Sequence, residues 1–239
     1  MWQSSPKNID LSPTDIHVWK ANMDIELSLQ NKFWLTLSED EKIRANRFRF
    51  PHLRVRYIAA RGILRHLLAK YLSVSAESIR FEYGEQGKPF LSDFPTFKFN
   101  ISHSHDHVVF AFAQDMTLGI DVEFINPKID CEVIAPRFFS KNEAATLLAL
   151  PPADRPPVFF NCWTRKEAFI KAKGGGLSIP LDQFEVTLLA DDTPQLLAID
   201  WAPNEVKSWS IFSFSVNEEF VGALMTAGEV GEVFWFEYV

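Results

Sequence analysis

Three carboxylates in two short segments have the types and spacing of a metal site. Asp121 and Glu123 alternate with apolar residues in Gly119-Ile120-Asp121-Val122-Glu123. Because residues i and i+2 of a strand lie on the same face, these two carboxylates would point the same way, about 7 Å apart along the strand. The simplest alternative is an ordinary half-exposed strand with a polar outer face.

A third carboxylate, Glu167, lies four residues before Lys171, so the two would share one face of a helix. They could form a surface ion pair of small energetic worth. They could equally supply a third metal ligand and a cation for phosphate. Oxygen ligands suit Mg²⁺, with Mn²⁺ as an alternative, and Mg²⁺ commonly takes further ligands from substrate phosphates. We therefore predict a divalent metal held by Asp121, Glu123 and Glu167 in an enzyme that acts on a phosphate-containing substrate.

Three histidines, His103, His105 and His107, alternate in a second polar segment. They would share a face if the segment were one strand, but Ser104-His105-Asp106 is typical of a turn. We therefore expect no metal site there, and expect one of these histidines to bind an anion or position a proton.

The net charge of −7 argues against nucleic-acid binding, but residues 41–70 hold nine Lys or Arg and one acid, Glu41. A solvated helix face would usually mix charges, so this segment favours an anionic ligand over that alternative. We find no signal peptide, and no apolar run approaches the roughly 20 residues that span a bilayer, which predicts a cytoplasmic protein with no membrane partner. The two cysteines, Cys131 and Cys162, are expected to be free thiols.

The elements that must position these residues can be read from periodicity and breakers. Helices are expected to start at Ser38 and Ser140, which act as N-caps, and over 54–72 and 159–173, the last stopped by Gly174-Gly175-Gly176. The proline pairs 151–152 and 156–157 are expected in loops. Strands are expected over 79–83, 97–102, 108–113, 118–124, 184–189, 209–216, 220–226 and 233–238.

The order of helix then strands occurs twice, and residues 114–124 can be laid over 228–238 without a gap. This pattern predicts two related α+β halves, 1–119 and 120–239. The overlay puts Trp235 opposite Asp121, so only one half carries the acidic pair. A ligand site at the interface of the halves is expected, and the internal duplication favours a monomer.

Five motifs in fixed order and at suitable spacing carry a resemblance to a known family. They are Gly87-Lys88-Pro89, Phe99-Asn100-Ile101-Ser102-His103-Ser104, Gly119 to Glu123, Arg137-Phe138-Phe139-Ser140 and Trp163-Thr164-Arg165-Lys166-Glu167-Ala168-Phe169-Ile170-Lys171. The set resembles the 4′-phosphopantetheinyl transferases of the surfactin-synthetase-activator (Sfp-like) type. The resemblance spans about residues 38–190, and the last 50 residues match only in general character.

This resemblance implies an Mg²⁺-dependent transfer of the 4′-phosphopantetheine group from coenzyme A to a serine of an apo acyl, peptidyl or aryl carrier protein, releasing adenosine 3′,5′-bisphosphate. It also implies an α+β fold of two pseudo-symmetric halves, each a long helix packed on a small antiparallel sheet. Coenzyme A would lie between them, with its adenosine and phosphate contacts in the N-terminal half and the metal site in the C-terminal half. The carrier could serve fatty acid, polyketide or nonribosomal peptide synthesis.

Carried over by motif, Asp121, Glu123 and Glu167 would hold Mg²⁺ with the coenzyme A pyrophosphate, which Lys171 would contact. Ser102, His103 and Lys88 would line the site of the adenosine phosphates. Arg44 and Arg56 would lie near the 3′-phosphate, although Glu41 or Lys42 stands where the family often has a basic residue. The expected catalytic set is Glu167, Lys171, His103 and Lys166.

A base must remove the serine proton, and Glu167, directly or through a water, is the first candidate and Glu143 the second. Lys166 would instead orient the serine or screen charge. Two other interpretations remain at this point: a different Mg²⁺-dependent phosphoryl-transfer enzyme or nuclease, and a non-catalytic carrier-binding module. Intact carboxylates count against the module, because without a metal it has no need to bury three acids.

Overall fold

The computed structural model describes residues 2–6, 9–189 and 192–239. Its helices are α1 (Leu27–Thr36), α2 (Glu39–Asn46), α3 (Pro51–Leu72), α4 (Cys131–Phe138), α5 (Lys141–Leu148) and α6 (Arg155–Lys173), with 3-10 turns η1 (Ala76–Ser78), η2 (Pro152–Asp154), η3 (Gly176–Ser178), η4 (Leu181–Gln183) and η5 (Pro203–Ser208). Its strands are β1 (Gln3–Ser4), β2 (Ile16–Asn22), β3 (Glu82–Tyr83), β4 (Pro89–Phe90), β5 (Phe97–Ser104), β6 (His107–Gln114), β7 (Thr117–Phe124), β8 (Phe184–Val186), β9 (Leu196–Ile199), β10 (Trp209–Asn217), β11 (Phe220–Ala227) and β12 (Val233–Glu237).

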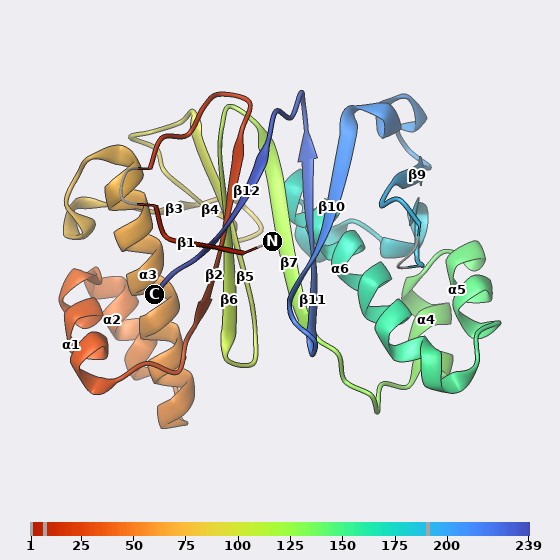
Figure 1. Ribbon diagram of the computed structural model, residues 1–239, viewed down its shortest axis with the longest axis horizontal. Helices are drawn as coiled ribbons and strands as arrows, with labels where there is room; N and C mark the ends of the chain where they lie inside the picture. Colours follow the sequence, from red (N-terminus) through yellow and green to blue (C-terminus); the bar gives the residue numbers. More distant parts are fainter. Residues whose placement is uncertain (1, 7–8, 190–191) are drawn as a thin grey trace.

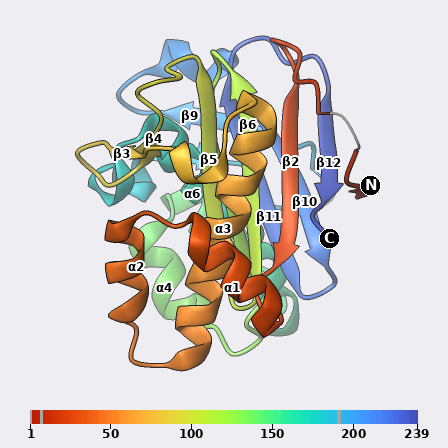
Figure 2. The same cartoon turned by 90° about the vertical axis from the view of Figure 1, so that its left-hand side faces the viewer.

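The strands form two main sheets, ordered β1-β12-β2-β6-β5 and β10-β11-β7, and two short hairpin-like pairs, β3-β4 and β8-β9. The two main sheets occupy the centre of the molecule (Figure 1). Helices α1 to α3 cover the outer side of the first sheet, and α4 to α6 cover the outer side of the second (Figures 1 and 2). The fold therefore has four layers: helices, sheet, sheet, helices.

Strand β6 shows how the sequence builds these layers. Val108, Phe110 and Phe112 belong to the core beneath α1 to α3, whereas Val109 and Ala111 alternate with them and belong to the core between the two sheets. A strand covered on both faces has no use for polar residues, which explains its continuous apolar run. No helix in the described part of the chain is both long and apolar enough to cross a membrane.

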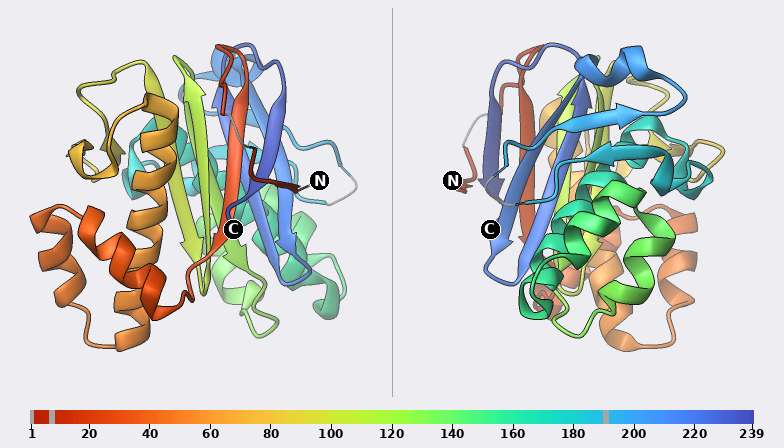
Figure 3. Two further views of the ribbon diagram at one scale, coloured as in Figure 1. Left: turned by 60° about the vertical axis from the view of Figure 1, so that its left-hand side comes forward. Right: turned by 90° about the vertical axis from the view of Figure 1, so that its right-hand side faces the viewer.

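Each half of the chain lends its last strand to the sheet of the other half. After α3, β5 and β6, the chain enters β7, which pairs antiparallel with β11. After α6, β10 and β11, it enters β12, which returns to the first sheet and pairs parallel with β2 (Figure 3). The predicted α+β fold of two related halves is confirmed, but the larger sheet is mixed and not purely antiparallel. The predicted boundary at residue 119 falls within β7.

Local sequence signals account for the ends of the main helices. Ser140 and Glu143 form the expected capping box of α5, and α6 ends at Gly174, whose φ of 73° suits glycine. The expectation of a loop at Pro156-Pro157 is wrong, because both prolines lie in the first turn of α6. Proline is accepted there because the first turn of a helix needs no backbone donor.

Candidate active site

Strand β7 turns one face to the other sheet and the opposite face to α6. Ile120 and Val122 are buried between the sheets, so Asp121 and Glu123 point toward α6. The two elements touch backbone to backbone at Gly119, where an added Cβ would lie 2.2 Å from the carbonyl oxygen of Ala168. Glycine at this position therefore sets the spacing between the acids of β7 and the side chains of α6.

Asp121 forms the centre of a three-residue cluster. The Lys171 ammonium donates to Asp121 Oδ1 at 2.6 Å and to Ser102 Oγ at 2.9 Å, and the Ser102 hydroxyl donates to the same Oδ1 at 2.8 Å. Asp121 is only 3% exposed, and its other oxygen, Oδ2, is buried without a hydrogen-bond partner among the described residues. A buried carboxylate oxygen without a partner is costly unless it binds a ligand or a cation.

Glu123 and Glu167 lie in the same electrostatic environment. Burial, followed by the charge of Asp121, raises the pKa of Glu123 to about 7, while a hydrogen bond from Ser104 and the charge of Lys171 oppose the shift. Burial and Asp121 likewise raise the pKa of Glu167, and Lys171 again opposes this. The three acids repel one another here, and one lysine compensates them only in part.

Asp121, Glu123 and Glu167 have the ligand atoms and the negative charge that a divalent cation needs, although their side chains do not converge on one point. Among the described residues, no three His, Cys, Asp or Glu side chains converge closely enough to hold a metal ion as they stand. Their ligand atoms are nevertheless all carboxylate oxygens, which Mg²⁺ prefers, and the unpartnered Asp121 Oδ2 is an available ligand. An added positive charge would also offset the burial and the repulsion by Asp121 that together raise the pKa values of both glutamates.

Lys88 joins the N-terminal half to the end of α6. Its ammonium donates to the carbonyl oxygens of Lys171 at 2.7 Å, Leu118 at 3.0 Å and Ala172 at 3.5 Å. Burial lowers the pKa of Lys88 to about 8. Lys88 lines a hollow of about 280 Å³ together with Glu167 and Lys171. Its ammonium is directed at the backbone, however, so a direct phosphate contact by this group does not fit the structure.

The histidine segment folds as the turn-like residues predicted. His105 lies between β5 and β6 with a φ of 54°, which breaks the alternation and separates His103 from His107. His103 is at the same end of β5 as Ser102. Desolvation by the surrounding protein, and then the charge of Lys171, lower the pKa of His103, so its imidazole is predominantly neutral at pH 7.

Lys166 and Glu143 lie in the core and not in the site. Lys166 is fully buried, and its ammonium reaches Glu143 Oε2 at 2.7 Å and the carbonyl oxygens of Leu181 and Phe184. Glu143 is 2% exposed and also accepts the backbone N–H groups of Ser140 and Val186. The structure therefore places Lys166, which was expected to orient the serine or screen charge, and Glu143, the second candidate base, together in the C-terminal core.

Much of the basic segment 41–70 serves the fold. Glu41 is 1% exposed and accepts the guanidinium Nε of Arg61 at 2.6 Å and of Arg65 at 2.7 Å. Arg56 forms a two-point pair with Asp24, at 2.7 and 2.9 Å. Glu41, the single acid in the segment, thus forms buried ion pairs with two of its arginines. Neither interpretation of the sequence, a solvated helix face or an anion site, includes such buried pairs.

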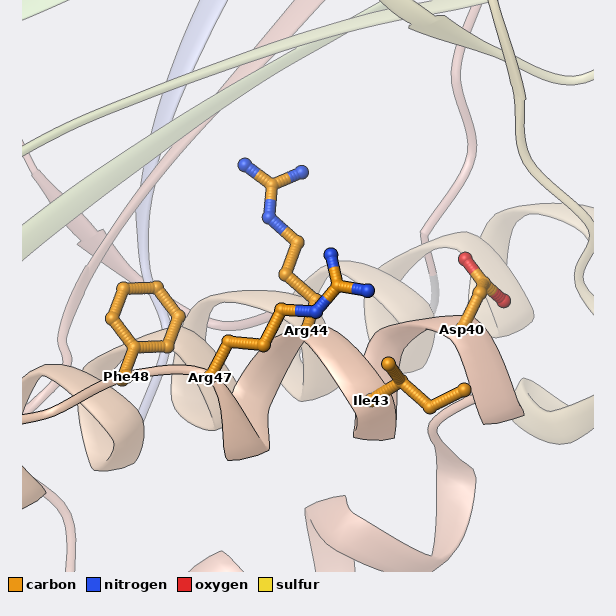
Figure 4. A pocket seen from close by; sticks show the side chains of 5 residues that line it. All are labelled: Asp40, Ile43, Arg44, Arg47 and Phe48. Carbon is orange, nitrogen blue, oxygen red and sulfur yellow. The ribbon is translucent and has the colours of Figure 1, made fainter.

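Arg44 belongs to the part of this segment that faces solvent. It lines an open hollow of about 650 Å³ with Asp40, Ile43, Arg47 and Phe48. The guanidinium groups of Arg44 and Arg47 extend from the same side of α2 (Figure 4). Arg47 was not singled out from the sequence, although its spacing of three residues from Arg44 places both on one helix face.

Sequence reasoning also missed Ser104, whose hydroxyl donates to Glu123 Oε2 at 2.9 Å. The available signal was alternation: Asn100, Ser102 and Ser104 are polar residues at every second position of a strand otherwise rich in apolar groups.

Comparison with known proteins gives a consistent result over most of the chain. The family described as "4′-phosphopantetheinyl transferase superfamily" matches residues 117–224, and the one described as "4′-phosphopantetheinyl transferase, N-terminal" matches residues 26–115. The 4′-phosphopantetheinyl transferase HetI of Nostoc sp. is 36% identical over 230 residues, covering 95% of this chain and 94% of that protein. Sfp of Bacillus subtilis is 35% identical over 81% of this chain and 87% of its own length, and psf-1 of Bacillus pumilus is 39% identical over 73% and 74%.

Proposed function

The chain belongs to the 4′-phosphopantetheinyl transferase superfamily, and from this we propose that the seam between β5, β7 and α6 is where it transfers phosphopantetheine from coenzyme A to carrier proteins. This membership favours the transferase over a nuclease or a non-catalytic carrier-binding module.

The observation that carries the proposal is the cluster at Asp121. Lys171 and Ser102 hold one oxygen of this buried carboxylate, and the other has no partner among the described residues. Such a carboxylate can bind a cation that also binds the phosphates of a substrate. Asp121, Glu123 and Glu167 would hold Mg²⁺, or Mn²⁺ in its place. When bound, the metal would neutralise the pyrophosphate of coenzyme A and stabilise the charge that develops on the leaving group.

Lys171, held in place by Asp121 and Ser102, would bind and orient that pyrophosphate. The Lys171 ammonium has three donor hydrogens and uses two of them on Asp121 and Ser102. We propose that the third donates to a phosphate oxygen. His103, on the same strand, would donate to a second phosphate oxygen from its neutral imidazole.

Glu167 is our proposed base. It lines the hollow next to Lys171, where its carboxylate can accept the serine proton directly or through a water. The carrier serine would give its hydroxyl proton to the Glu167 carboxylate as its oxygen attacks the phosphorus of the phosphopantetheine group. The bond to adenosine 3′,5′-bisphosphate would then break.

We further propose that the N-terminal half binds the adenosine end of coenzyme A. Arg44, with Arg47 beside it, would bind the 3′-phosphate, and Arg56 would do so only by exchanging its Asp24 partner. One chain supplies both sides of the seam, so we propose that a monomer in the cytoplasm is active. Size-exclusion chromatography of active protein tests the oligomeric state.

The deciding experiment measures transfer directly. The protein is incubated with coenzyme A, Mg²⁺ and apo carrier proteins of the acyl, peptidyl and aryl types, and each carrier is weighed by intact mass spectrometry. We expect a mass gain of one phosphopantetheine group at the carrier serine. Absence of any gain across all three carrier types contradicts the proposal. Asp121→Ala and Glu167→Ala should lose the transfer while keeping the parent circular dichroism spectrum.

A further inference from the structure

Strands β5 and β7 lie side by side at the border between the two main sheets without a backbone ladder joining them. Strand β5 pairs with β6, and β7 pairs with β11. The backbone donors on one edge of β7 therefore need partners from elsewhere, because an unpaired buried N–H group is costly.

Three side chains of β5 supply those partners in register. Asn100 Oδ1 accepts the N–H of Ile120 at 2.8 Å, Ser102 Oγ accepts that of Val122 at 3.4 Å, and Ser104 Oγ accepts that of Phe124 at 3.1 Å. We call these three contacts the side-chain interlock. It holds the two sheets together at the seam, at the place where a backbone ladder would otherwise lie.

Each serine of the interlock also donates its hydroxyl hydrogen to an acid of β7. Ser102 donates to Asp121 Oδ1 at 2.8 Å, and Ser104 donates to Glu123 Oε2 at 2.9 Å. A hydroxyl has one donor hydrogen and can accept as well, so each serine can make both contacts at once. Each serine thus binds one carboxylate oxygen of an acid and, at the same time, the backbone N–H group of the residue that follows this acid in β7.

We propose that Ser104 is a positioning residue for metal binding, which orients the Glu123 carboxylate through the side-chain interlock. The proposal rests on the metal site given under "Proposed function". Ser104 does not touch substrate; it acts through Glu123, as a partner behind a ligand holds that ligand in place. Loss of its hydroxyl frees the Glu123 carboxylate to rotate and leaves the Phe124 N–H without its acceptor.

The test measures binding of Mn²⁺ to the protein with saturating coenzyme A, by electron paramagnetic resonance of free Mn²⁺. Removing a group that supports a metal ligand typically weakens metal affinity by about 10–100-fold. We expect Ser104→Ala to weaken Mn²⁺ binding about tenfold and Ser104→Thr, which keeps the hydroxyl, to stay within about threefold of the parent. Ser215→Ala, an exposed serine on β10, is the matched control and should leave binding unchanged.

A double variant separates positioning from a general loss of structure. If Ser104 acts through Glu123, Ser104→Ala should add little to the loss caused by Glu123→Gln, whereas an independent structural effect would multiply with it. Should Ser104→Ala not fold, Ser104→Cys, which keeps the size and weakens the hydrogen bonds, takes its place.

Two results distinguish failure of this proposal from failure of the metal site. Parent-like Mn²⁺ binding in Ser104→Ala, with binding lost in Asp121→Ala, overturns the positioning role alone. Parent-like binding in Asp121→Ala as well overturns the metal site and with it this proposal. Equal weakening in Ser104→Ala and Ser104→Thr also overturns it, because the hydroxyl would then not be the cause.

Discussion

The buried pair of Lys166 and Glu143 allows stability and catalysis to be separated in one variant. Lys166 is 0% and Glu143 2% exposed, and the Lys166 ammonium makes three short contacts, all to groups of the C-terminal core. Lys166→Met keeps the length of the side chain and removes the charge. It leaves the Glu143 carboxylate buried without its counter-charge, which is the costly way to break such a pair.

Breaking a buried pair from one side costs about 3–5 kcal/mol. With a urea dependence of about 2 kcal/mol/M, a loss of about 4 kcal/mol lowers the unfolding midpoint by about 2 M. The assay is urea unfolding followed by tryptophan fluorescence, alongside kcat/KM for carrier modification measured well below the variant's midpoint. We expect the large drop in midpoint, and kcat/KM within about threefold of the parent for the folded protein.

Two further variants test whether the loss of stability in Lys166→Met comes from the unpaired Glu143 carboxylate. Lys173→Met removes a lysine from the same helix whose partner, Glu205, is half-exposed, and it should cost less than about 1 kcal/mol. Glu143→Gln combined with Lys166→Met should be more stable than Lys166→Met alone, since the uncompensated charge is gone. An unchanged midpoint in Lys166→Met together with a hundredfold loss of kcat/KM would refute this reasoning and return Lys166 to the chemistry.

The remaining predictions concern packing, pH and the hollow beside the site. Gly119→Ala should lower the free energy of unfolding by more than the roughly 1–3 kcal/mol of ordinary overpacking and should reduce transfer, because the added methyl group meets the backbone of α6. In the control Gly84→Ala, the nearest atom to the added methyl group is 3.8 Å away, so the free energy of unfolding should change by less than about 0.5 kcal/mol. Thermal unfolding and kcat/KM check both variants. Burial lowers the pKa of His17 to about 4, so the folded protein keeps it neutral while the unfolded chain protonates it below about pH 6.5. Its contribution to stability is therefore present above pH 6.5 and lost toward pH 4 at up to about 1.4 kcal/mol per pH unit; urea unfolding from pH 7 to 4 should show a shallower fall in His17→Gln, and an identical slope would contradict this. Lys88→Met should lower stability and raise KM for coenzyme A modestly, because its ammonium holds the end of α6; a kcat/KM loss of a hundredfold with parent stability would instead favour a direct phosphate contact.

Local patterns predicted the elements of the site well. The alternation in β7 gave the common face of Asp121 and Glu123, and the four-residue spacing gave the common face of Glu167 and Lys171. Both are short-range geometric rules. The same rules could have warned against Lys166, because neighbours in a helix do not face the same way and Lys166 directly precedes Glu167.

Long-range pairing was not available from these patterns. The overlay of residues 114–124 on 228–238 aligned the segment that forms β7 with the segment that forms β12, but it could not indicate that each strand joins the sheet of the opposite half. Likewise, the charge count over residues 41–70 could not reveal that Glu41 is buried between Arg61 and Arg65, since that depends on α2 packing against α3. An internal ion pair and an anion site have the same composition.

The exchange of strands explains why the site lies where it does. Because β7 leaves its own half for β11, its free edge meets β5 across a break between sheets, where backbone donors are satisfied by side chains. Such a break admits polar groups into the middle of an otherwise apolar fold, and it does so in pairs, one serine to one acid. A continuous sheet would have satisfied these backbone N–H groups with backbone carbonyl oxygens, and the side chains of Asn100, Ser102 and Ser104 would not be needed as acceptors. The duplicated fold therefore creates, at the one seam where β7 crosses over, both the space for a polar site and the side-chain contacts that hold its acids in place.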